Sequence, residues 1–164
     1  MTKTEPSTSE NISTDARAAL VVAHPGHELC LYGWLKSARP RVFILTDGSG
    51  HSGKPRTERT TRILKELGAS FGSFYGRFSD AAIYEALLNY RFDLFISLAE
   101  ELAAQIINER IESVVADARE GYNPAHDVCR LVVDMAVEIA RRTSSGKIDN
   151  LQFLVVSKPD SLLS

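Results

Sequence analysis

The stretch Ala19-Leu-Val-Val-Ala-His-Pro-Gly-His-Glu28 decides how the rest of the chain is interpreted. Its apolar first half predicts a short buried strand over 18–23, and the residues from 27 to 37 predict a helix. His24 and His27 lie at the junction between the two. In an open α/β sheet, ligands and catalytic groups lie where a strand ends and the next helix begins. We therefore expect this junction to carry part of a functional site.

The composition is that of an ordinary soluble protein. The chain has 164 residues, of which 44% are hydrophobic and 24% are charged, and its formal net charge is −2. No basic cluster indicates nucleic-acid binding, and no apolar run approaches the roughly 18 residues that a membrane span needs. The first residues lack the apolar core of a secretory signal, so we expect a cytoplasmic protein.

Short apolar segments alternate with helical patterns along the chain. This alternation predicts an α/β fold whose mostly parallel sheet, of about five strands, is covered by helices on both faces. We expect residues 1–16, rich in Thr, Ser and Glu, to be a disordered tail, and residues 17–164 to form a single domain. The predicted strands are 18–23, 41–46, 71–78, 113–116 and 151–156. The predicted helices are 27–37, 57–67, 80–88, 92–109 and 126–142.

Histidines gather in the loops that follow these strands. Because parallel strands end at one edge of a sheet, the loops 24–28, 47–55 and 117–126 should lie together. All four histidines of the chain fall in them: His24, His27, His51 and His126. Three imidazoles with an open fourth position form a known catalytic zinc site, and imidazole also suits iron, copper or nickel. We expect His24, His27 and His126 to hold Zn²⁺ or another divalent transition metal, although any one of them could instead cap a loop.

Five carboxylates in the same loops are candidates for supporting roles: Glu28, Asp47, Asp117, Glu120 and Asp127. A metal site needs a base within hydrogen-bond reach, or a carboxylate behind a ligating histidine. Glu28 and Asp127 could instead stabilise helix first turns, and Asp47 could bond the backbone of its own turn. Asp117, directly after a predicted strand, is the strongest of the five.

The glycine-rich loop 47–55 does not match a nucleotide site. It lacks the Gly-x-x-x-x-Gly-Lys-Ser/Thr and Gly-x-Gly-x-x-Gly patterns, so nucleotide binding is disfavoured. Arg56 after this loop could hold an anionic or hydroxyl-rich substrate, or be a solvated residue at the start of a helix.

Four motifs resemble those of one enzyme family. Ala23-His-Pro-Gly-His-Glu28 resembles the Ala-His-Pro-Asp-Asp-Glu signature of the LmbE-like (PIG-L) N-acetylglucosaminyl deacetylases. The other matches are Leu45-Thr-Asp-Gly48, Arg56 followed by Leu67-Gly68, and Gly121-Tyr-Asn-Pro-Ala-His126. Members of this family are zinc-dependent hydrolases with a Rossmann-like fold, and they remove N-acetyl groups, typically from glucosamine derivatives. The resemblance implies a Rossmann-like three-layer sandwich here.

The resemblance also implies a ligand set. His24 and His126 match two of the family's metal ligands, and His27 takes the place of the third, an aspartate. The chain departs from the family at four other positions. Gly26 stands where the family has its general base, and Arg59 replaces a glutamate. Asn123 and Ala125 replace the histidine and aspartate of the last motif.

These matches imply a divergent zinc-dependent hydrolase whose substrate is a small molecule, such as an N-acetyl sugar conjugate. Asp47 or Asp117 would then act as the base, because each lies at the end of a strand that neighbours the first strand. Arg56 and Asn123 would orient the substrate. Two alternatives stay open: a catalytically silent metal-binding or accessory protein, and a different reaction at a three-histidine metal centre. We expect no nucleic-acid or membrane partner, and a homo-oligomer is an open option.

Overall fold

The sheet of this protein is entirely parallel, with strand order β3-β2-β1-β4-β5. The computed structural model describes residues 17–144 and 146–155, so the expected tail lies outside the described residues. The strands are β1 (Ala18–Val22), β2 (Arg41–Thr46), β3 (Ser70–Phe78), β4 (Ser113–Asp117) and β5 (Asp149–Phe153). The α-helices are α1 (Tyr32–Ala38), α2 (Thr57–Glu66), α3 (Asp80–Leu88), α4 (Phe92–Asn108) and α5 (Pro124–Thr143). The predicted α/β, Rossmann-like three-layer sandwich is confirmed.

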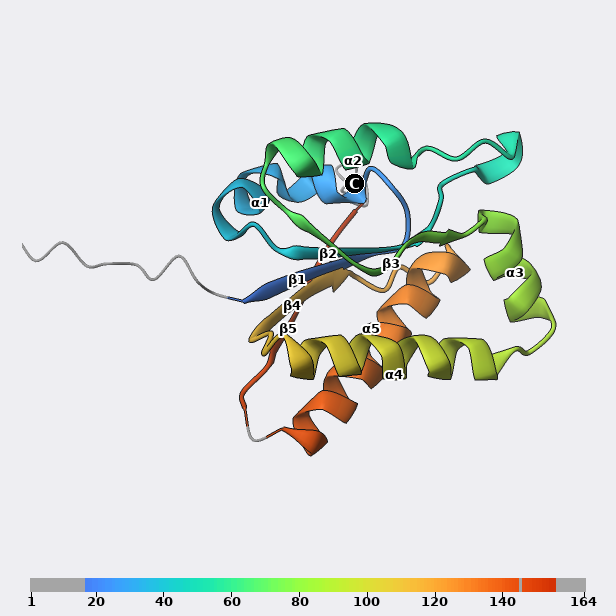
Figure 1. Ribbon diagram of the computed structural model, residues 1–164. Helices are drawn as coiled ribbons and strands as arrows, with labels where there is room; N and C mark the ends of the chain where they lie inside the picture. The colour runs from blue at the N-terminus through green and yellow to red at the C-terminus, as the bar shows by residue number, and fades with distance from the viewer. Residues whose placement is uncertain (1–16, 145, 156–164) are drawn as a thin grey trace, which may run out of the picture.

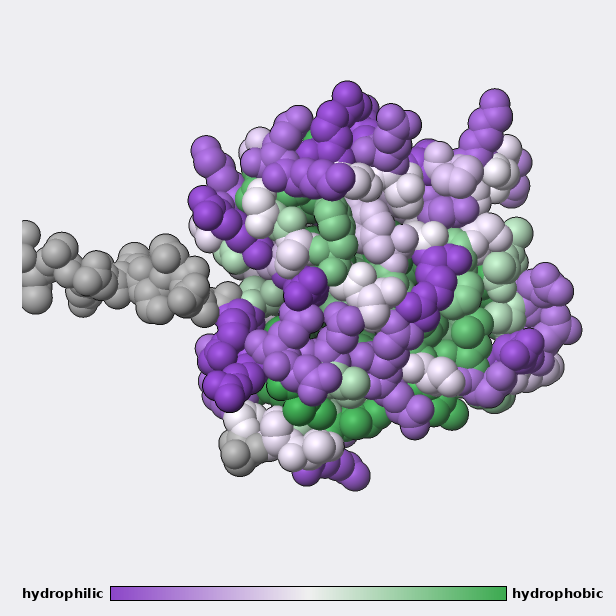
Figure 2. All heavy atoms as spheres, in the orientation of Figure 1, coloured by the Kyte–Doolittle hydropathy of each residue, from purple (hydrophilic) through white to green (hydrophobic). Residues whose placement is uncertain are grey.

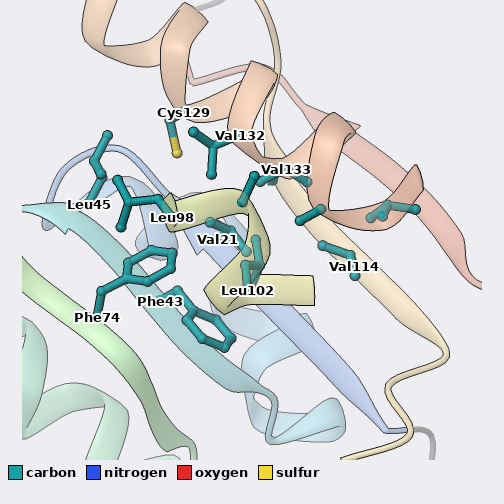
Figure 3. Packing of buried hydrophobic residues seen from close by; sticks show 14 of the residues in the cluster. Val21, Phe43, Leu45, Phe74, Leu98, Leu102, Val114, Cys129, Val132 and Val133 are labelled. Atoms are coloured by element: carbon teal, nitrogen blue, oxygen red, sulfur yellow. The ribbon is translucent and has the colours of Figure 1, made fainter. Parts of the chain in front are cut away.

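Helices cover both faces of the sheet (Figure 1). On one face, Phe43 of β2 and Phe74 of β3 pack toward Leu98 and Leu102 of α4, and α5 completes this layer (Figure 3). On the other face, a smaller cluster buries Leu35 of α1 and Leu64 of α2 against the sheet. The outer side of α2 is charged, as the purple side chains over it show (Figure 2). Both faces of the sheet are therefore buried, which explains why β1 is apolar throughout.

The predicted boundaries differ from the observed ones by more than one residue at three elements. The predicted helix 27–37 is a 3₁₀ turn over His27–Leu31 that continues into α1. Helix α5 begins at Pro124 rather than at 126, because the Asn123 side chain accepts a hydrogen bond from the Ala125 N–H. β5 begins at Asp149, before the predicted 151, because its polar first residues pair in register with the start of β4. β5 also ends at Phe153, before the predicted 156, which itself lies outside the described residues.

The strand order places the loops of interest together. β1 lies between β2 and β4: the chain passes from β1 to β2 and β3 on one side, and then crosses over to form β4 on the other side. Such a reversal of strand order opens a crevice at the carboxyl ends of the central strands. The loops after β1 and β4 both begin at this crevice.

Candidate functional site

Three histidines meet at the carboxyl edge of the sheet. His24 follows β1, His27 begins the 3₁₀ turn, and His126 lies in the first turn of α5. The ring centroids of His24 and His27 are 5.3 Å apart, those of His24 and His126 are 5.0 Å apart, and those of His27 and His126 are 4.6 Å apart. The fold therefore brings together side chains that lie about a hundred positions apart in the sequence.

A buried glutamate holds the turn that carries the first two histidines. Gly26 adopts a φ of +109° between His24 and His27, a conformation that other residues rarely adopt. Glu28 is fully buried, and its two carboxylate oxygens accept hydrogen bonds from the Gly26 N–H (2.7 Å) and the Thr60 hydroxyl (2.8 Å). Glu28 thus anchors the turn to α2, a more specific role than the helix-end charge that the sequence suggested.

Each of the three imidazoles meets a carboxylate through its Nδ1 atom. His27 Nδ1 lies 2.9 Å from Asp117 Oδ2, and His126 Nδ1 lies 2.7 Å from Glu120 Oε2. His24 Nδ1 lies 2.9 Å from Asp80 Oδ1. This arrangement leaves Nε2 of each ring as the nitrogen that could bind an ion. Histidines that bind metals commonly donate their other ring nitrogen to a carboxylate in the same way.

His24 has a second polar neighbour. Its Nδ1 lies 2.7 Å from the Thr46 hydroxyl, slightly closer than the 2.9 Å that separates it from Asp80 Oδ1. Burial lowers the pKa of His24 below the usual value, although the Asp80 charge opposes this effect. Burial alone would raise the pKa of Asp80, but hydrogen bonds from Thr46 and the Gly50 N–H hold it below its ordinary value. At neutral pH the pair is therefore a neutral imidazole beside an ionised carboxylate.

The carboxylates behind the histidines carry buried oxygens that have no hydrogen-bond partner. Among the described residues, four buried side-chain polar atoms form no hydrogen bond of good geometry, and three of them are Asp117 Oδ1, Glu120 Oε1 and Asp80 Oδ1, the last of which still has its 2.9 Å contact with His24 Nδ1. An unpaired buried carboxylate oxygen is costly, and a cation close by offsets that cost. The unpaired oxygens therefore gather where a positive charge would be stabilised.

The three rings fit a metal ion in spacing but do not form a ready-made ligand group. Imidazoles that bind zinc tetrahedrally, with Zn–N of about 2.0–2.1 Å, hold their ring centroids about 5 Å apart. The observed separations are close to this value. In residues 17–144 and 146–155, however, no three or more His, Cys, Asp or Glu side chains are arranged to hold an ion as they stand. Binding would therefore require small shifts of the rings.

A pocket of about 650 Å³ opens beside this cluster. Its lining includes His24 and His27 together with these polar residues: His51, Arg56, Asp80, Tyr84 and Asn123. The Arg56 guanidinium donates to the Gly48 carbonyl, and Asn123 Oδ1 accepts from the Tyr84 hydroxyl at 3.3 Å. Both residues that the sequence assigned to substrate binding thus reach the pocket.

The two aspartates that the sequence offered as bases do not line this pocket. Asp47 Oδ1 accepts a hydrogen bond from the Ser49 N–H (2.9 Å), so its carboxylate shapes its own turn. Asp117 contacts His27 but has no exposed surface. Asp117 therefore contacts the histidine cluster from its buried side, and Asp47 lies outside the cluster.

Sequence reasoning missed Asp80 and did not rank Glu120. Asp80 was assigned only the start of a helix, yet it both lines the pocket and contacts His24. Its position two residues after the end of β3, at the same edge of the sheet, is the signal that could have identified it. Asp127 accepts hydrogen bonds from the backbone of Glu120 and Gly121, so it shapes the loop that carries Glu120.

Comparison with known proteins adds no assignment. No family model matches the chain, and no curated protein matches it in sequence. The likeness to the LmbE-like family therefore rests on the motifs quoted above. None of the helices in the described part of the chain is long and apolar enough to cross a membrane.

We predict that Gly26→Ala destabilises the fold by about 1–3 kcal/mol, because the positive φ is unfavourable for alanine. Gly33→Ala is the matched control. An added Cβ meets no atom within 4 Å at either glycine, and of the two only Gly26 has a positive φ. Urea unfolding of both variants measures the difference. Equal free energies of unfolding for the two variants would show that the turn at Gly26 is not constrained.

Proposed function

We propose that this protein is a divergent metal-dependent hydrolase of the LmbE-like type. Zinc is the first candidate ion, and the substrate is an amide such as the N-acetyl group of a sugar conjugate. The observation that carries this proposal is the histidine cluster: three ring centroids within 5.3 Å of one another, each imidazole with a carboxylate at its Nδ1. A cluster that only stabilised the fold would not require three buried carboxylates with unpaired oxygens.

The donor set favours a transition metal. Neutral imidazole suits zinc, iron, copper or nickel, whereas magnesium and calcium prefer oxygen ligands. His24, His27 and His126 would hold the ion, and Asp80, Asp117 and Glu120 would orient them. When bound, such an ion polarises a carbonyl group and makes water a usable nucleophile near neutral pH.

The pocket supplies the substrate side of the proposal. Its volume of about 650 Å³ lies within the range of small-molecule sites. Arg56 and Asn123 would orient a polar substrate there, and the exposed ring of Tyr84 offers a surface for a sugar or another flat group. A proton acceptor must reach the substrate. Besides the proposed ligands, the pocket residues able to accept a proton are Asp80 and His51.

A second candidate is a metal-binding protein without hydrolytic activity. It is favoured by Gly26, which leaves open space where the family has its catalytic carboxylate, and by the positions of Asp47 and Asp117 outside the pocket. A different reaction at a three-histidine centre is a weaker option. A cytoplasmic location stays a prediction from the sequence, and a homo-oligomeric state stays an open option.

Metal content tests the first part of the proposal. We expect the tag-free protein to retain about one zinc per chain after dialysis, measured by mass spectrometry of the metal. His27→Ala and His126→Ala should lose most of it. His51→Ala is the matched control and should keep it, because His51 lies in the pocket but outside the ring cluster. Zinc retention in both ligand variants would contradict the assignment.

Acetate release from N-acetylglucosamine conjugates tests the reaction. We expect turnover by the zinc-loaded protein and its loss in His27→Ala, because that variant lacks a ligand of the proposed ion. Asp47→Asn should keep the wild-type rate, since its carboxylate faces the Ser49 N–H instead of the pocket. Tight zinc binding without turnover on any conjugate would favour the metal-binding protein.

A further inference from the structure

We infer that Asp117 is a positioning residue: it fixes the His27 ring so that Nε2 is the nitrogen offered to an ion. This inference rests on the proposed function and changes the role that the sequence suggested for Asp117. Asp117 Oδ2 lies 2.9 Å from His27 Nδ1 and accepts a hydrogen bond from the Ala23 N–H at 2.7 Å. Because Oδ2 already accepts the Ala23 N–H, we assign it as the acceptor of the His27 contact as well, which places the proton on His27 Nδ1. The lone pair of the neutral ring is then on Nε2.

Burial separates this role from that of a base. The Asp117 side chain has no exposed surface and does not line the pocket, whereas a base must come within hydrogen-bond reach of the proton that it removes. Its second oxygen, Oδ1, is also buried and has no hydrogen-bond partner within residues 17–144 and 146–155. Asp117 can therefore act on the site only through the groups that Oδ2 contacts.

The position of Asp117 in the sheet explains why one carboxylate can orient two of the proposed ligands. It is the last residue of β4, which pairs with β1 up to the contact of Val21 with Ala116. The Ala23 N–H that it binds belongs to the residue directly before His24. Asp117 thus holds the backbone that leads into one proposed ligand and the side chain of another.

Zinc affinity tests this role, with the two strand-end aspartates as a matched pair. We expect Asp117→Asn to weaken zinc binding about 10–100-fold in the full chain, measured by competition with a chromogenic chelator, as is typical for loss of a carboxylate behind a ligating histidine. Asp47→Asn removes the same charge from the end of β2, where the carboxylate accepts the Ser49 N–H, and should leave the affinity unchanged. Wild-type affinity in Asp117→Asn, or equal weakening in both variants, would overturn the positioning role.

The tautomer of His27 gives a readout that needs neither metal nor a substitution of Asp117. In the metal-free wild type, at a pH above the end of the ring's titration, ¹⁵N NMR should show His27 protonated at Nδ1. Its signals are assigned by their loss in His27→Ala. A proton on Nε2 would refute the inference even if Asp117→Asn did not fold. A wild type that binds no zinc would instead refute the proposed function, so the two failures are distinguishable.

Discussion

The contact between Asp117 and the end of β1 is the constraint on which the site depends. A buried carboxylate at the last position of β4 accepts the Ala23 N–H and meets His27 Nδ1. This contact is possible because the parallel sheet places β1 and β4 side by side in register. The turn that carries His24 and His27 is thereby tied to the centre of the sheet on one side and, through Glu28 and Thr60, to α2 on the other.

Charge balance links the geometry to function. Asp80, Asp117 and Glu120 place three carboxylates in a largely buried region, each beside an imidazole and each with an unpaired oxygen. Burial lowers the pKa of His24, so that ring does not supply a compensating charge at neutral pH. A divalent cation would neutralise most of the negative charge of these carboxylates. It would also stabilise the folded chain by mass action, because the three histidines meet only in the folded state.

The sequence predicted the fold and the meeting of the histidines, but not how the supporting side chains are oriented. Apolar strands alternating with helices leave few other architectures, and loops after parallel strands must share an edge. That rule was enough to bring His126 to His24. The sequence offered the bond of Asp47 to its own turn only as one of two roles. It could not show that Asp117 turns behind His27 or that Asp80 reaches His24, because side-chain direction within a loop depends on local backbone angles. β5 was misplaced because its first residues, Asp149 and Asn150, are polar.

Zinc K-edge X-ray absorption of the zinc-loaded protein tests the central claim most directly, because it identifies the ligands of the bound ion. Our account predicts a nearest shell of nitrogen and oxygen at about 2.0–2.1 Å, with the outer-shell scattering of three imidazoles. A nearest shell that contains sulfur at about 2.3 Å, or one without imidazole scattering, would contradict it.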